Sequence, residues 1–178
     1  ADREVVSEIV FNTSMAGYLE VLTDPSYAGQ AVCMTYPLIG NYGVCKDDME
    51  SKKPWPDGFI VRELSRNFSN FRADFSIQQF LEENNVPGIA GIDTRALTKI
   101  LRKKGTMNGM ITTDAHYKLD EVLPRLKAYT TGKVVEKVTC KEKYELKGSR
   151  DLSENGALSG SAKFVQAAYE AGEREKKP

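Results

Sequence analysis

The apolar residues of this chain lie in short segments separated by turn-forming residues, and this spacing limits the possible folds more than any other feature of the sequence. Three of the segments are predicted β-strands, and they span residues 5–11, 30–36 and 59–64. A short helix is predicted over 18–22, and it is expected to stop at 23–25 because the residue before Pro25 disfavours helical geometry. The glycines, charges and prolines of 40–58 predict a long exposed loop.

Helical signals follow these strands along the chain. Ser76 and Gln79 fit a capping box, in which each side chain satisfies a free backbone amide at the start of a helix over 77–85. A second helix is predicted over 94–104, with Asp93 as its N-cap and Gly105 as the residue that ends it. The apolar positions expected on one face are Leu97, Ile100 and Leu101 in this helix, and Leu119, Val122, Leu123 and Leu126 in a third helix over 119–129.

The order of these elements predicts the fold class and the domain boundary. Strands come mostly first and helices later, with some alternation that includes short strands over 89–92 and 107–112. This order is typical of a layered α/β domain of mixed α+β character, which we assign to residues 1–148. Glycine and serine are abundant after this point, so residues 149–178 are predicted to be a linker and a charged tail, with a short helix fitting from residue 162.

Charge and cysteine content argue against several classes of partner. Lys and Arg number 25, as do Asp and Glu, so a formal net charge of zero gives no reason to expect nucleic acid or an anionic membrane as a partner. No apolar run approaches the roughly 20 residues that span a bilayer, and the charged first residues lack the apolar core of a secretory signal. Three widely spaced cysteines are typical of reduced thiols. These features predict a cytoplasmic protein.

The sequence offers few candidates for catalysis. A cysteine nucleophile needs a nearby base, and the one histidine, His116, falls at a predicted strand-to-helix turn that favours a solvated or capping role. Cys33 is expected in the core and Cys45 on the surface. No cysteine and histidine spacing typical of zinc is present, and the acidic residues Asp47, Asp48 and Glu50 fit a solvated loop. We therefore predict no catalytic residue and no metal ligand in this chain.

Three turns stand out because they combine glycine, proline and hydroxyl residues. The first two contain Asn12, Thr13, Ser14, Gly17, Tyr18, Asp24, Pro25, Ser26 and Tyr27, and the third spans 36–43. Such turns present backbone amides and hydroxyls to a polar ligand or another protein, or serve only as turns. The residues alone leave both readings open.

The same turns carry a resemblance to a known family. The segments 11–18, 22–30 and 34–43 closely resemble the small subunit of carbamoyl phosphate synthetase. The likeness continues through 58–63, 69–72, 87–98 and 101–109, and it covers residues from about 4 to about 146. Several long motifs in the family's order make this a specific resemblance.

The resemblance implies a layered swivelling β/β/α domain that packs beside a class I glutamine amidotransferase domain and docks on a large synthetase subunit. In that complex, glutamine is hydrolysed and its ammonia reaches the large subunit, which makes carbamoyl phosphate for arginine and pyrimidine synthesis. ATP, bicarbonate and Mg belong to the large subunit, so this chain is expected to bind no cofactor. The family's serine that contacts glutamine corresponds to Ser26, and the other turn residues are expected to support it.

The chain also departs from the family pattern. The family's opening strand and the cysteine, histidine and glutamate of the amidotransferase domain are not found in this sequence. We therefore expect the chain to be inactive alone and to work in a heterodimer with the large subunit. A non-catalytic interaction module that keeps the fold is the alternative, and a free-standing hydrolase ranks last.

Overall fold

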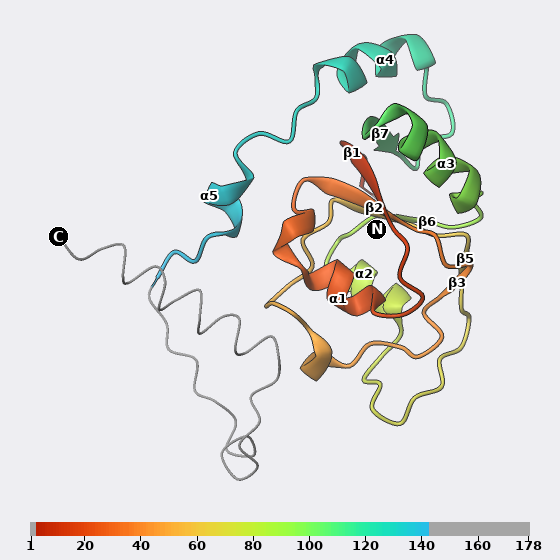
Figure 1. Cartoon of the computed structure of the whole chain (residues 1–178), viewed down its shortest axis with the longest axis vertical. Coiled ribbons are helices and arrows are strands. Elements are labelled where there is room, and N and C mark those ends of the chain that lie inside the picture. Colours follow the sequence, from red (N-terminus) through yellow and green to blue (C-terminus); the bar gives the residue numbers. More distant parts are fainter. Residues whose placement is uncertain (1–2, 143–178) are drawn as a thin grey trace, which may run out of the picture. The chain divides into compact units, whose positions relative to one another are not determined.

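A computed structural model describes residues 3–142 and places a five-stranded sheet at the centre of this part of the chain (Figure 1). The strands are β1 (Val5–Asn12), β2 (Gln30–Met34), β4 (Gly58–Ile60), β6 (Gly88–Ile89) and β7 (Met107–Ile111). Their order across the sheet is β6-β4-β2-β1-β7. The first four are mutually parallel, and β7 runs antiparallel to β1. The predicted mixed α/β class is confirmed.

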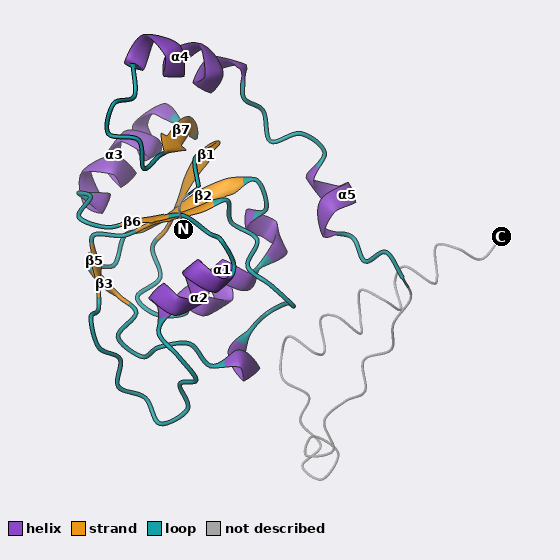
Figure 2. Ribbon diagram, turned by 180° about the vertical axis from the view of Figure 1, so that it is seen from behind, coloured by secondary structure: helices purple, strands orange, loops and turns teal. Residues whose placement is uncertain are grey.

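Two helices cover one face of the sheet. They are α1 (Tyr18–Thr23) and α2 (Ile77–Glu83), and Figure 2 shows them together below the strands. Leu22 of α1 and Phe80 of α2 form a core with Val32 and Phe59 of the sheet. Because β2 lies between two parallel strands in a sheet with both faces covered, its residues from Ala31 to Met34 are apolar and buried on both sides.

The opposite face of the sheet carries a smaller core beneath α3 (Thr94–Lys104). Leu101 of α3 packs there with Ile9, Cys33 and Ile60. A further helix, α4 (Leu119–Ala128), contacts β7 and β1 near the sheet edge. The apolar faces predicted for these two helices are only partly confirmed. Leu101 and Val122 are buried, but the side chain of Ile100 is 45% exposed. Leu119 and Leu123 are also exposed.

Smaller elements complete the described part. They are a two-stranded sheet of β3 (Leu38–Ile39) and β5 (Glu63–Leu64), the 3-10 helices η1 (Pro25–Tyr27) and η2 (Lys46–Asp48), and α5 (Val134–Val138). The single strand predicted over 59–64 was wrong, because this segment supplies strands to two different sheets. Its chain turns at Arg62, whose carbonyl accepts from Gly91 N, and Glu63 N then donates to the carbonyl of Pro37.

Local helix signals agree closely with the structure. Ser76 accepts a hydrogen bond from Gln79 N, and Asp93 accepts one from Ala96 N, as expected of N-caps. The capping box is only half formed, because the side chain of Gln79 donates to Glu83 instead of reaching back. The boundary near residue 148 and the tail at 149–178 lie outside the described residues.

Within residues 3–142, no helix combines the length and the apolar character needed to cross a membrane.

Candidate functional site

The first and third predicted turns meet at two tyrosine side chains, Tyr18 and Tyr42. The hydroxyl of Tyr42, in the third turn, accepts hydrogen bonds from Gly17 N at 2.7 Å and Tyr18 N at 3.2 Å. These are amides at the start of α1, which have no partner within the helix. Tyr18 in turn stacks on Tyr42 and donates its hydroxyl to the carbonyl of Gly43 at 2.6 Å. Burial raises the pKa of the Tyr42 hydroxyl above the ordinary tyrosine value.

Asn12 joins the first turn to the second. It is the last residue of β1, and its Oδ1 accepts from Ser14 N at 2.8 Å. Its Nδ2 donates to the hydroxyl of Tyr27 at 3.1 Å. The carbonyl of Asn12 also accepts from Thr35 N, just after β2. One asparagine therefore fixes the first turn, the second turn and the end of a neighbouring strand.

Ser26 lies in a turn that is held by its own backbone and by Asp24. Asp24 Oδ1 accepts from Ser26 N at 2.8 Å, and the carbonyl of Asp24 accepts from Tyr27 N. Pro25 is at the first position of η1, where its fixed φ suits the turn. The side chain of Ser26 is exposed, and its hydroxyl makes no hydrogen bond to any described residue. The turn thus presents a free hydroxyl on a constrained backbone.

The predicted turn residues do not all lie in this cluster. Asn12, Ser14, Gly17, Tyr18, Asp24, Pro25, Ser26 and Tyr27 belong to the linked turns described above. Thr13 instead lines a separate hollow with Thr35 and Arg62. Sequence reasoning included Tyr42 in the third turn but missed its contacts with the first, because these depend on a tertiary contact.

The cysteines do not form a nucleophilic site with the histidine. Cys33 is buried as predicted, and burial raises the pKa of its thiol to about 11. Cys45 was expected on the surface but is buried, since neighbouring Val44 pairs with Phe75 and Arg72 donates to its sulfur at 3.5 Å. His116 is exposed, and no hydrogen bond among the described residues joins it to a cysteine.

The acidic residues also lack a catalytic or metal-binding arrangement. Asp48 pairs with Arg72 at 2.7 Å, so one carboxylate of the predicted solvated loop has a cation partner. Among residues 3–142, no group of three His, Cys, Asp or Glu side chains is placed to hold a metal ion.

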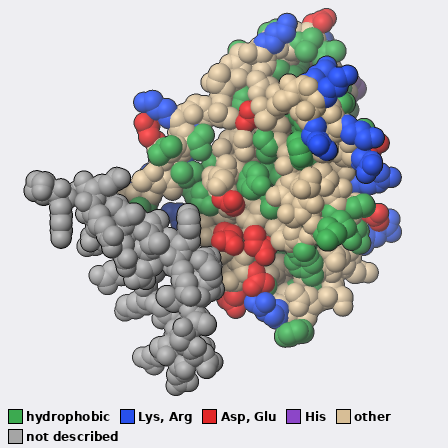
Figure 3. Space-filling view, viewed as in Figure 1, with side chains coloured by type: hydrophobic (Ala, Val, Ile, Leu, Met, Phe, Trp, Pro, Cys, Tyr) green, Lys and Arg blue, Asp and Glu red, His purple; other side chains and the backbone are tan. Residues whose placement is uncertain are grey.

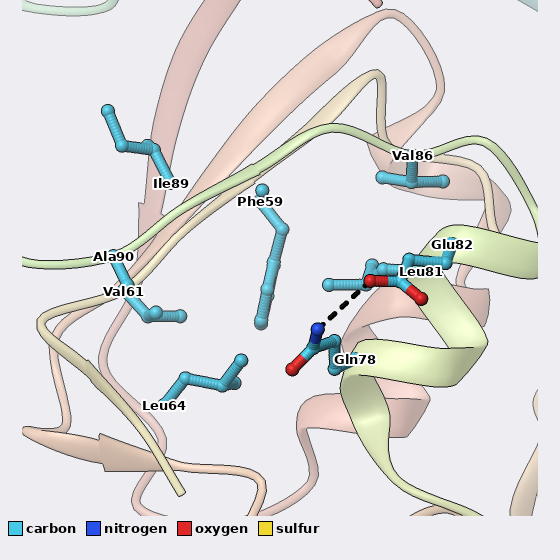
Figure 4. Close-up of a pocket in the computed structure, with 10 residues that line it drawn as sticks. Phe59, Val61, Leu64, Gln78, Leu81, Glu82, Val86, Ile89 and Ala90 are labelled. Carbon is cyan, nitrogen blue, oxygen red and sulfur yellow. Dashed lines mark hydrogen bonds between the residues drawn. The ribbon is translucent and has the colours of Figure 1, made fainter. Parts of the chain in front are cut away.

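An apolar hollow of about 200 Å³ lies between α2 and the strands β4 and β6 (Figure 4). Phe59, Leu64 and Leu81 line it, and Gln78 donates to Glu82, one turn further along α2, at 3.0 Å. Glu82 is the only titratable residue among those that line it. This hollow has no convergent polar groups, so it carries no chemistry that we can assign.

Comparison with known proteins gives a consistent result. A family model described as the carbamoyl-phosphate synthase small chain, CPSase domain, matches residues 1–111. The carbamoyl phosphate synthase small chain of Clostridium perfringens is 53% identical over 146 residues, which cover 82% of this chain and 42% of the relative. That of Aquifex aeolicus is 50% identical over 146 residues, covering 81% of this chain and 39% of the relative. That of Nitratidesulfovibrio vulgaris is 56% identical over 124 residues, covering 70% and 33%. The chain therefore spans less than half the length of each of these relatives.

Proposed function

The chain belongs to the carbamoyl phosphate synthase small chain family, and we propose that it serves as the N-terminal domain of the small subunit in a glutamine-dependent synthase. In this role it docks on the large synthetase subunit and supports the delivery of ammonia from glutamine. The large subunit holds ATP, Mg and bicarbonate, and this chain binds none of them. The proposed setting is the cytoplasm, in a pathway leading to arginine, pyrimidines or both.

The geometry of Ser26 supports a contact with glutamine. Its hydroxyl is exposed and free of partners among the described residues, while Asp24 holds its backbone amide. A hydroxyl donates one hydrogen bond and accepts others, so it can recognise either the amide or the charged groups of glutamine. A constrained turn reduces the ordering cost of such a contact.

The test compares two nitrogen sources in the complete synthase that contains this domain. With glutamine, we expect Ser26→Ala to raise KM about tenfold, the loss that one hydrogen bond to a polar substrate typically causes. With ammonia, synthesis should keep its wild-type rate, because ammonia needs no glutamine site. Ser69→Ala is the matched control, since Ser69 is exposed in a different loop. Equal loss with both nitrogen sources would mean that Ser26 supports the fold rather than the substrate.

We assign the hydrolysis of glutamine to residues outside this chain. Cys33 and Cys45 are buried, and a thiol with the raised pKa of Cys33 is a poor nucleophile at neutral pH. The purified 178-residue chain should therefore release no ammonia from glutamine above the buffer rate. Measurable hydrolysis by the purified chain would contradict this assignment, and a Cys140→Ser variant would then show whether the exposed thiol or a buried one is responsible.

Docking on the large subunit is tested by size-exclusion chromatography of the two purified chains. We expect co-elution, because the proposal assigns this domain a share of the subunit interface. The large subunit run alone and mixed with an unrelated protein of similar size controls for nonspecific association. Separate elution at micromolar concentrations would favour the alternative role as an interaction module with another partner.

A further inference from the structure

A second hollow, of about 380 Å³, lies at the carboxyl ends of the parallel strands. Thr13 follows β1, Thr35 follows β2, and Arg62 follows β4, and all three line it. Because these strands are parallel, their carboxyl ends meet at one edge of the sheet. In open α/β sheets, ligands bind in the crevice outside this edge. The place of the hollow therefore suits a ligand site.

Helix α3 forms the other wall of the hollow and supplies most of its charge. Arg95, Lys99 and Arg102 line it from positions four and then three residues apart, so they share one face of the helix. Arg62 adds a fourth cation from the link between β4 and β5. Figure 3 shows Lys and Arg side chains gathered along the side of the molecule that carries α3.

These four cations have no anionic partner in the described part of the chain. Other arginines do find one: Arg72 pairs with Asp48, and Arg125 pairs with Glu4 at 2.6 Å. Neither an Asp nor a Glu lines the hollow. Four unpaired cations around one space repel one another and produce a positive potential that favours an anion. The charge is therefore unlike an ordinary mixed surface, where both signs alternate.

Neutral hydrogen-bond donors complete the lining. Thr13, Thr35, Thr94 and Thr98 contribute four hydroxyls to the hollow. Thr98 is only 9% exposed, and its hydroxyl meets the thiol of Cys33, a weak hydrogen-bonding group, but no nitrogen or oxygen partner among the described residues. A buried polar group without a good partner costs free energy, which a bound ligand can recover. Guanidinium groups and hydroxyls are the side chains that commonly bind phosphate and carboxylate oxygens.

We propose that this hollow binds a small anion whose charge is carried by phosphate or carboxylate groups. Its volume falls within the range of about 300–1,000 Å³ that is typical of small-molecule sites. The cations stand on two sides of a hollow, from α3 and from Arg62, which suits a compact ligand better than a flat acidic protein surface. The site differs from the turn of Ser26, which does not line it.

The first test is isothermal titration of the complete 178-residue chain with pyrophosphate and, separately, with citrate. We expect saturable binding of one molecule of at least one probe, and the stronger probe identifies phosphate or carboxylate as the preferred group. Arg62→Gln and Arg95→Gln should each weaken that binding about tenfold, as expected for a charge-assisted hydrogen bond. Affinity should fall as ionic strength rises.

A matched pair of variants separates a built site from general attraction to a basic helix. Lys99→Gln removes a charge that lines the hollow, while Lys104→Gln removes one from the same helix that does not. We expect at least fivefold weaker binding for Lys99→Gln and less than twofold change for Lys104→Gln. The four substituted positions, Arg62, Arg95, Lys99 and Lys104, are exposed, so the variants should fold. Circular dichroism checks this.

Three results would overturn the proposal. They are equal weakening by Lys99→Gln and Lys104→Gln, the absence of saturable binding for both probes, and binding of acidic peptides without binding of either small anion. None of these results depends on glutamine use or on the large subunit. The anion site and the function proposed above are therefore tested independently.

Discussion

The hydroxyl of Tyr42 accepts hydrogen bonds from the backbone amides of Gly17 and Tyr18, while the ring of Tyr42 stacks on that of Tyr18 with centroids 4.2 Å apart. Helix α1 has no side-chain cap from its own N-cap residue, Gly17. Tyr42, 24 positions along the chain from Tyr18, therefore caps the start of α1, a role that a local serine or aspartate usually has. Through this contact the third turn fixes the start of α1 and, with it, the first turn.

Removing the Tyr42 hydroxyl should destabilise the domain without disturbing the stacked rings. Tyr42→Phe leaves two helix-start amides without their acceptor, so we expect the free energy of unfolding to fall by about 1–2 kcal/mol. Urea denaturation followed by circular dichroism measures this loss. Tyr36→Phe is the control, since Tyr36 is exposed and its hydroxyl bonds to no described residue. A loss as large in the control would show that the effect does not come from capping.

Asp24 should stabilise the turn of Ser26 mainly by accepting a hydrogen bond, and only to a smaller extent by its negative charge. Asp24→Ala removes the acceptor of Ser26 N, and we expect unfolding free energy to fall by about 1 kcal/mol. Asp24→Asn keeps an amide oxygen at the same place and should lose less than half as much. Chemical denaturation of both variants gives the comparison. Equal losses would mean that the negative charge, rather than the hydrogen bond, stabilises the turn.

Features that depend on neighbouring residues were predictable from the sequence. Helix α3 has the predicted bounds because Asp93 and Gly105 mark its ends locally. Strand β1 ends one residue beyond its prediction, and the end of α2 differs by two residues. Such signals act within one turn of helix or a few residues of strand, where the sequence alone determines the balance of local interactions.

Features that depend on distant residues were not predictable in this way. Nothing near Arg62 in sequence indicates that the chain leaves one sheet there and enters another, because Pro37 supplies the pairing carbonyl. Cys45 looks exposed beside Lys46 and Asp47, yet the pairing of Val44 with Phe75 buries it. The sequence also did not predict the hollow lined by four cations at the carboxyl ends of the strands. Arg62 and Arg95 come together only when the strands and α3 are assembled.

The raised pKa of Cys33 gives the domain a pH dependence in the alkaline range. The folded state keeps this thiol protonated up to a pKa of about 11, whereas the unfolded chain loses the proton near pH 9. The folded state therefore binds more protons in this window, and stability should fall as pH rises from about 9 to about 11. Burial raises the pKa of Tyr18 and Tyr42 as well, which adds loss of the same sign at higher pH.

Denaturation midpoints between pH 7 and pH 11 measure this effect, and Cys33→Ala separates the contribution of the thiol. The variant loses some core packing at all pH values, but its stability should decline less steeply between pH 9 and pH 10 than that of the wild type. A parallel decline in both proteins would show that Cys33 does not cause the pH dependence.

The same burial predicts which thiols react. Cys140 is exposed, whereas Cys33 and Cys45 are buried. Titration of the native chain with a disulfide reagent at pH 8 should therefore show one fast thiol and two that react only on unfolding. Cys140→Ser should abolish the fast phase. A fast phase that persists in this variant would mean that Cys45, at the edge of the third turn, opens readily to solvent.

Two glycines with similar backbone angles allow steric overlap to be measured apart from backbone strain. Gly40 has φ of 93° and Gly91 has φ of 85°, a region that side-chain-bearing residues rarely adopt. A Cβ on Gly40 would lie 2.7 Å from Ile77 Cγ2, and one on Gly91 would meet no atom within 4 Å. Gly91→Ala should therefore cost about 1–2 kcal/mol from strain alone.

Gly40→Ala should cost the same strain plus the displacement of Ile77 from the core beneath α2, about 1–3 kcal/mol more. The difference between the two variants in urea denaturation is the measurement, because the strain common to both cancels. Ile77→Val shortens the side chain that α2 places against the third turn. Combined with Gly40→Ala, it should recover part of the stability difference between the two single glycine variants. Equal stability of the two single variants would show that Ile77 moves away freely and that the contact between α2 and the third turn is loose.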